Sequence, residues 1–195
     1  MISVVLLCAG KSQRMGSSKL LLPFRGKTVI ETILDTLLSS DVNKIVTVLR
    51  KGDEEILKLI PDNEKILKTF NPDPEGDMFS SIVCGVKSIV GEPGGVMIFL
   101  GEHPLVSSET VNRLVEAFNS SDKKIIIPVY NGINGHPVIL HESLMEEILG
   151  GTFKNGLKGL IEAHENDILK ITVDCKGTVI DLDTPEDYKK LLEES

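Results

Sequence analysis

The chain has 195 residues, 41% of them hydrophobic and 26% charged, which is typical of a globular protein with a full core. Its net charge of −8 argues against a general binder of nucleic acid or anionic membranes, and its 4% aromatic content argues against base-stacking platforms. Cys8, Cys84 and Cys175 are far apart and form no CxxC pair, which disfavours a disulfide framework or a zinc site. We therefore expect one cytoplasmic domain over residues 1–195, with no membrane segment and no nucleic-acid partner.

Strand and helix patterns alternate along the chain. In chain order, strand 2–7 precedes helix 28–38, strand 44–49 precedes helix 54–60, strand 65–69 precedes helix 79–90, and strand 96–100 precedes helix 107–118. The second part of the chain predicts a strand at 123–129, a strand after the glycine-rich loop at 131–136, helices at 144–149 and 157–164, strands at 169–173 and 179–182, and a last helix capped by Thr184. This alternation predicts an α/β fold with a mostly parallel sheet covered by helices on both faces.

Ligands of such sheets bind at the carboxyl ends of the strands. That rule points to the loops after Leu7, after Leu100 and around Gly135. The first of these loops, "CAGKSQRMGSSK", is unusual because it places cations among small residues in an acidic protein. Its glycines can present backbone N–H groups, and its cations can bind phosphate oxygens. We therefore expect an anion site here, although each lysine taken alone could be an ordinary surface residue.

Two common phosphate motifs do not fit this loop. Gly10-Lys11-Ser12 has the end of a Walker A motif, but Val5 stands where its first glycine belongs. The chain also lacks the GxGxxG fingerprint of dinucleotide-binding folds. A different phosphate-binding loop is therefore expected.

The loop "LCAGKSQRMGSSKLLLPFRGK" resembles the G-x-x-x-R-M-G-x-x-K signature of the MobA-like nucleotidyltransferases, and most of all the molybdenum cofactor cytidylyltransferase (MocA-like) subgroup. Five further segments resemble blocks of that subgroup in the same order: "NPDPEGDMFSSIVCGV", "LGEHPLV", "NGHPVIL", "NGLKGLIEAH" and "DLDTPEDY". The resemblance covers nearly the whole chain. It implies a single-domain, Rossmann-like nucleotidyltransferase fold of the GT-A-like type.

The resemblance also implies a reaction. A phosphate on the acceptor attacks the α-phosphate of a nucleoside triphosphate and releases pyrophosphate. The implied substrates are CTP and the molybdopterin cofactor, with Mg²⁺ as the metal, Mn²⁺ as its substitute, and a molybdoenzyme as the receiver of the product. Such chemistry needs charge neutralisation and alignment rather than a covalent protein nucleophile.

Residue roles follow from the same resemblance. Arg14 and Lys19 would be catalytic: Arg14 holds the triphosphate, and Lys19 stabilises charge at the α-phosphate. The nucleotide would also be bound by Cys8, Ala9, Gly10, Lys11, Ser12, Gly16, Asn71, Ser80 and Ser81. The alternative for the two serines is an ordinary helix N-terminus.

Glu102 and Asp183 stand where the family has metal-binding carboxylates, and Mg²⁺ usually takes one or two of these. Glu102 departs from the family, which has Asp there, and His103 follows where Met is common. Asp183 could instead cap the last helix, but Thr184 can fill that role and leave Asp183 for the metal.

His136 and Lys158 are the candidates for acceptor contact. Lys158 stands where the family has Arg, and its alternative is a lysine on a helix surface. The alternative for His136 is a structural loop histidine.

The base is inferred from the first loop. Cytidylyltransferases of this superfamily tend to show L-A-A-G where guanylyltransferases show L-A-G-G, and the methyl group of Ala9 favours a pyrimidine. Two alternatives stay open: a transferase that uses GTP or another acceptor, and a non-catalytic nucleotide-binding chaperone that delivers the cofactor, which Glu102 favours.

Overall fold

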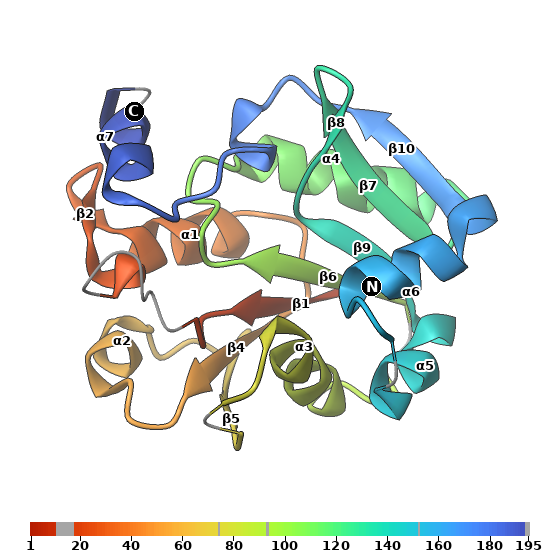
Figure 1. The fold of residues 1–195 in the computed structure, drawn as a ribbon, viewed down its shortest axis with the longest axis horizontal. Coiled ribbons are helices and arrows are strands. Elements are labelled where there is room, and N and C mark those ends of the chain that lie inside the picture. The colour runs from red at the N-terminus through yellow and green to blue at the C-terminus, as the bar shows by residue number, and fades with distance from the viewer. Residues whose placement is uncertain (11–17, 74, 93, 152, 194–195) are drawn as a thin grey trace.

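The computed structural model describes residues 1–10, 18–73, 75–92, 94–151 and 153–193, and its central feature is one mixed sheet (Figure 1). The strands are β1 (Ile2–Leu7), β4 (Lys44–Arg50), β5 (Ile66–Asn71), β6 (Gly95–Leu100), β7 (Ile125–Tyr130), β8 (Ile133–Asn134), β9 (Val138–His141) and β10 (Ile168–Thr172). Their order is β10-β7-β9-β6-β1-β4-β5, and β8 pairs with β7. Only pairings that involve β8 or β9 are antiparallel among the described strands of this sheet. The predicted mostly parallel sheet is confirmed.

Helices cover both faces of the sheet (Figure 1). On one face lie α1 (Val29–Leu38), α2 (Glu54–Leu59), α4 (Ser108–Asn119) and α7 (Pro185–Glu193); on the other lie α3 (Met78–Lys87), α5 (Met145–Gly150) and α6 (Leu157–Ala163). Within β1, Val4 and Leu6 belong to the first core and Val5 to the second. Alternate side chains of a strand point to opposite faces, so a strand buried on both faces has a continuous apolar run.

The predicted cap of the last helix at Thr184 is confirmed, and α1 has a cap that was not predicted. The Thr184 hydroxyl donates to Asp187 Oδ2 at 2.7 Å and accepts from the Asp187 N–H at 3.2 Å, and Pro185 takes the first helical position. Thr28 and Glu31 form a reciprocal cap of the same kind on α1. Such caps satisfy backbone N–H groups that have no partner within the helix. Thr184 therefore caps α7 and leaves Asp183 available for another role.

The predicted strand at 179–182 is wrong. A 3₁₀ turn, η4 (Lys176–Thr178), precedes this segment, and the segment itself forms no strand. Leu182 is fully buried in the core under α7, and its N–H donates to the carbonyl of Glu102 at 3.0 Å. Its apolar character therefore reflects core packing beyond the sheet edge rather than strand pairing.

Sequence reasoning missed a short hairpin between the first loop and α1. Its strands are β2 (Pro23–Phe24) and β3 (Lys27–Thr28), and Arg25 and Gly26 turn the chain with φ of 50° and 78°. The Tyr188 hydroxyl donates to the Pro23 carbonyl at 2.5 Å, which attaches α7 to β2 (Figure 1).

The carboxyl ends of β1 and β6 lie side by side, because Leu7 pairs with Leu100. The Gly101 N–H donates to the Leu7 carbonyl at 3.1 Å. A Cβ at Gly101 would lie 2.8 Å from that oxygen, so only glycine allows this approach. The loops that follow the two strands therefore meet at one edge of the sheet. No helix in the described part of the chain is long and apolar enough to cross a membrane.

Candidate nucleotide site

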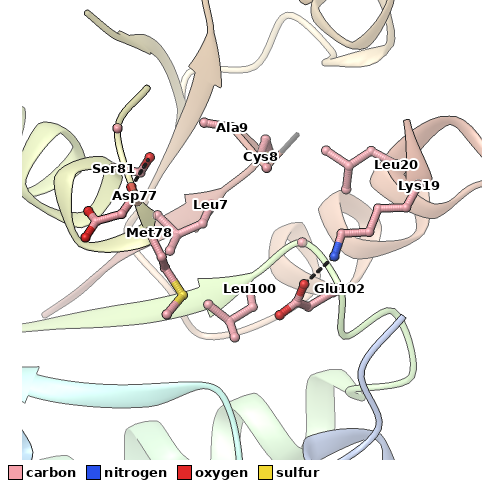
Figure 2. Close-up of a pocket in the computed structure, with 13 residues that line it drawn as sticks. Leu7, Cys8, Ala9, Lys19, Leu20, Asp77, Met78, Ser81, Leu100 and Glu102 are labelled. Atoms are coloured by element: carbon pink, nitrogen blue, oxygen red, sulfur yellow. Dashed lines mark hydrogen bonds and ion pairs between the residues drawn. The ribbon is translucent and has the colours of Figure 1, made fainter. Parts of the chain in front are cut away.

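A pocket of about 260 Å³ lies at this edge (Figure 2). The ends of β1 and β6, the turn before α3 and the start of η1 (Lys19–Leu21) form its walls. Its lining residues are Leu7, Cys8, Ala9, Gly10, Lys19, Leu20, Gly76, Asp77, Met78, Ser81, Leu100, Gly101 and Glu102. The pocket thus occupies the position that the strand-end rule predicts.

Lys19 connects the pocket to two carboxylates. Its ammonium group forms an ion pair with Glu102 and lies 3.0 Å from Asp183 Oδ1. The side chain of Lys19 is 12% exposed, whereas those of Glu102 and Asp183 are 26% and 30% exposed. Figure 2 shows the Lys19 side chain extending from η1 toward Glu102 at the end of β6. The fold therefore brings together three predicted residues that are far apart in sequence.

The first loop is described only as far as Gly10. The Cys8 N–H donates to the Val48 carbonyl at 2.9 Å, so this group is used in the sheet. Burial raises the pKa of the Cys8 thiol far above its ordinary value, so the thiol stays neutral. Ala9 and Gly10 line the pocket beyond that bond. The predicted residues Lys11, Ser12, Arg14 and Gly16 lie outside the described residues.

The opposite wall is the N-terminus of α3. Asp77 caps this helix by accepting the Ser80 N–H at 2.8 Å, and Ser81 lines the pocket. The Asn71 amide donates to the hydroxyls of Ser80 at 2.9 Å and Ser81 at 3.0 Å. Asn71 and Ser80 line a neighbouring hollow rather than this pocket. Of these three predicted residues, Ser81 is the one that lines the pocket, and Asn71 holds the helix start.

A second cluster lies on the other side of Glu102. The His103 ring is buried; its Nδ1 lies 3.0 Å from the Gly177 carbonyl and its Nε2 3.0 Å from Asp181 Oδ1. The adjacent imidazole holds the pKa of the Asp181 carboxyl below its usual range. The His136 ring centre is 5.6 Å from that of His103, and burial, with a smaller contribution from the neighbouring His103, lowers the pKa of His136 to about 4. His136 therefore belongs to this cluster and does not line the pocket.

Lys158 lies apart from both clusters. Its side chain is 78% exposed on α6, and its ammonium is 3.8 Å from Glu162, one helical turn away. This position matches the helix-surface alternative, and Lys158 does not line the pocket.

Sequence reasoning missed several lining residues and the second cluster. Leu20, Gly76, Asp77, Met78 and Gly101 were given no site role, although all but Leu20 flank predicted elements. Asp77 carried a usable signal, because Asp directly before an apolar helical segment is a common N-cap. His103 and Asp181 stood inside quoted motifs, but nothing in the sequence shows that residues 78 positions apart meet.

A parallel sheet with a pocket at the carboxyl ends of β1 and β6, lined by a lysine and a carboxylate, defines a nucleotide-binding α/β protein. Residues 4–168 match the family described as MobA-like NTP transferase domain. The chain belongs to this family and is a nucleotidyltransferase by family and by fold.

Curated relatives agree with this assignment. The chain is 34% identical over 137 residues to the bifunctional protein GlmU of Clostridium novyi. The matched stretch covers 69% of this chain but only 29% of that longer protein. It is 24% identical over 188 residues to the molybdenum cofactor cytidylyltransferase of Escherichia coli, covering 96% of this chain and 93% of that protein. It is 26% identical to the protein named probable molybdenum cofactor guanylyltransferase of Natranaerobius thermophilus, with 97% and 94% covered.

Solved structures show the same fold. Rv0371c of Mycobacterium tuberculosis H37Rv superposes with a TM-score of 0.85 at 24% identity, over 98% of this chain and 97% of that one. A structure of Rv0371c in complex with manganese has a TM-score of 0.79 at 22% identity, over 100% of this chain and 99% of that one. At these identities the likeness establishes the fold alone.

Proposed function

We propose that the chain transfers CMP from CTP to the phosphate of the molybdopterin cofactor and releases pyrophosphate. The observation that carries this proposal is the convergence of Lys19, Glu102 and Asp183 at the pocket where β1 and β6 end. Nucleotidyl transfer needs a cation at the α-phosphate and oxygen ligands for a metal beside it. The pocket offers both within one ion-pair network.

Lys19 supplies the positive charge in this proposal. In the free protein its ammonium is neutralised by Glu102 and Asp183. An arriving triphosphate offers the ammonium new oxygen partners and frees the carboxylates. Arg14, with Lys11 and the loop backbone through Ser12 and Gly16, is proposed to hold the remaining phosphate oxygens. Ser81 and the N-terminus of α3 are proposed to face the nucleotide from the opposite wall.

The carboxylates fit a divalent metal. Both place an oxygen against the same ammonium, so two hard oxygen donors from distant segments converge. Mg²⁺ prefers such donors and leaves its other positions to water and phosphate. We propose that Glu102 and Asp183 hold Mg²⁺ or Mn²⁺, which when bound would neutralise charge on the triphosphate. The manganese complex described for Rv0371c, which has the same fold, supports this choice of ion.

The choice of CTP rests on the cytidylyltransferase relative and on Ala9. That relative matches nearly the full length of both proteins. Ala9 lines the pocket. In this proposal its methyl group limits the approach of a purine. A guanylyltransferase is the second candidate, because the relative from Natranaerobius also matches over 97% of this chain.

A thermal-shift panel tests nucleotide binding at this site. CTP, GTP, ATP and UTP are each added with Mg²⁺ or Mn²⁺, and bound ligand raises the unfolding temperature by mass action. We expect CTP to give the largest shift, and Lys19→Ala to lose most of it. Lys27→Ala is the matched control, because Lys27 forms an exposed ion pair with Asp35 away from the pocket. The proposal fails if no nucleotide shifts the unfolding temperature; a larger shift with GTP favours the guanylyl alternative.

A further inference from the structure

Two buried side-chain nitrogens among the described residues have no hydrogen-bond partner, and both lie in the cluster beside Glu102: His103 Nε2 and His136 Nδ1. Buried polar atoms are nearly always satisfied, so such exceptions often mark a site for an ion or a water. The His103 nitrogen is the more informative of the two, because His103 is only 1% exposed and a carboxylate oxygen lies within reach.

The tautomer of His103 follows from its other nitrogen. Nδ1 lies 3.0 Å from the Gly177 carbonyl, and a carbonyl oxygen can only accept, so Nδ1 carries the proton and donates. In the neutral ring, Nε2 therefore presents a lone pair toward Asp181. Nε2 and Asp181 Oδ1 are 3.0 Å apart, yet they are not aligned for a hydrogen bond. The lone pair of His103 Nε2 and the carboxylate oxygen of Asp181 are therefore close enough to bind the same metal ion.

The supporting contact is rigid. A Cβ at Gly177 would lie 2.4 Å from the Leu105 carbonyl carbon, so glycine allows the η4 turn to pack against the loop after β6. This packing fixes the carbonyl that orients the His103 ring. Histidines that bind metals almost always donate their second ring N–H to a carbonyl or carboxylate. The Gly177 contact is of that kind.

Glu102 completes the donor set. One atom each from Glu102, His103 and Asp181 lies within 4.8 Å of the others. The Leu182 N–H donates a hydrogen bond to the Glu102 carbonyl at 3.0 Å, and this bond holds the two loops together. The set contains one imidazole nitrogen and two carboxylate oxygens. Imidazole suits several first-row transition ions, whereas Mg²⁺ prefers oxygen donors alone.

We propose that Glu102, His103 and Asp181 form a metal site that selects a divalent first-row transition ion over Mg²⁺. Three protein ligands leave coordination positions open, as in catalytic metal sites. This metal site rests on the proposed function only in that Glu102 serves both sites. His103 and Asp181 are thereby given a role separate from that of Lys19 and Asp183.

The test uses the full chain without nucleotide. Mn²⁺ is titrated, and free Mn²⁺ is followed by its electron paramagnetic resonance signal. We expect His103→Gln and Asp181→Asn each to weaken Mn²⁺ binding about tenfold or more, since even second-layer partners of metal ligands change affinity by about 10–100-fold. His164→Gln is the matched control, because His164 Nε2 also lies 3.0 Å from a carboxylate oxygen, that of Glu147, but His164 is not part of the Glu102–His103–Asp181 group. Its affinity should equal that of the parent. Mg²⁺ should displace Mn²⁺ only at tenfold or greater excess.

A spectroscopic signature separates a ligand from a structural residue. Electron spin-echo measurements on bound Mn²⁺ should show ¹⁴N coupling in the parent and in His164→Gln, and none in His103→Gln. Should His103→Gln not fold, the exposed Asp181 decides through Asp181→Asn. Weak or absent Mn²⁺ binding in the parent, unchanged affinity in Asp181→Asn, or no ¹⁴N coupling in the parent would overturn the proposal and leave an ordinary His–Asp ion pair. Nitrogen-coordinated Mn²⁺ in a protein that transfers no nucleotide would refute the proposed function but keep this site.

Discussion

Asp181 and Asp183 are separated by one residue, yet they have different partners. Asp183 lies 3.0 Å from the ammonium of Lys19, and Asp181 lies 3.0 Å from the imidazole of His103. Leu182 between them is anchored by its buried side chain and by its bond to the Glu102 carbonyl. A strand would turn both carboxylates to one face. Because the segment leaves the sheet, one acidic motif can serve two environments, one beside a lysine and one beside a histidine.

Glu102 belongs both to the ion-pair network of Lys19 and to the cluster of His103 and Asp181. We therefore expect its substitution to reduce turnover more than any other. Glu102→Ala should abolish metal-dependent turnover, since the charge stabilisation by a bound metal amounts to several kcal/mol. Glu102→Asp should keep or improve turnover, because the shorter acid loses less side-chain freedom on binding a metal. Pyrophosphate release with Mg²⁺ and with Mn²⁺ measures both variants. If Glu102→Ala turned over at the parent rate, Glu102 would not be a metal ligand.

Substitution of the proposed phosphate-binding cations Lys19 and Arg14 should have the next largest effect on activity. Lys19→Ala and Arg14→Ala should each lower kcat/KM by about one to three orders of magnitude, or roughly 2–4 kcal/mol of transition-state stabilisation. Steady-state kinetics measures this, with Lys27→Ala as the control on an exposed ion pair. Thermal unfolding should show that both variants stay folded. Unaltered kcat/KM in both Lys19→Ala and Arg14→Ala would contradict the assignment of the phosphate-binding site.

The His103 side predicts a dependence of stability on pH. Burial lowers the pKa of His136 to about 4, against 6.5 for the free side chain, so the unfolded chain binds a proton that the folded chain does not. The contribution of neutral His136 to the free energy of unfolding is therefore complete above pH 6.5 and is lost as the pH falls toward 4. The loss is on the order of 2–3 kcal/mol.

Urea unfolding in a chelator at pH 7 and pH 4.5 measures this loss. We expect His136→Gln to lose less stability between the two pH values than the parent does. An equal loss in parent and variant would show that His136 is not the group responsible.

The smallest expected effect concerns base choice at Ala9. Removing its methyl group in Ala9→Gly should narrow the difference between the CTP-induced and GTP-induced shifts of the unfolding temperature. The change should be modest, because one methyl group in a pocket discriminates by about 1–3 kcal/mol at most. A difference that stays the same would mean that Ala9 does not contact the base.

Much of the fold could be predicted because β1, β4 and β6 are buried on both faces and are therefore mostly apolar. Residues 179–182 are also mainly apolar, but for a different reason, the burial of Leu182 in the core beneath α7, and the sequence pattern alone cannot distinguish the two cases. The resemblance predicted Lys19, Glu102 and Asp183 as site residues, and the structure adds that they share one ion-pair network. The contact between His103 and Asp181 could not be predicted, because it depends on the η4 turn. The roles of Lys158 and His136 in acceptor binding, a receiving molybdoenzyme and a cytoplasmic location stay predictions.

The transfer of CMP to the acceptor can be measured directly. The full chain is incubated with CTP or GTP, Mg²⁺ or Mn²⁺ and the molybdopterin cofactor, and both pyrophosphate and the mass of the acceptor are followed. We expect pyrophosphate to appear only when acceptor, metal and nucleotide are all present. The acceptor should gain the mass of CMP, and CTP should be preferred over GTP. Nucleotide binding without pyrophosphate release under every combination would contradict this expectation and establish a binding protein instead.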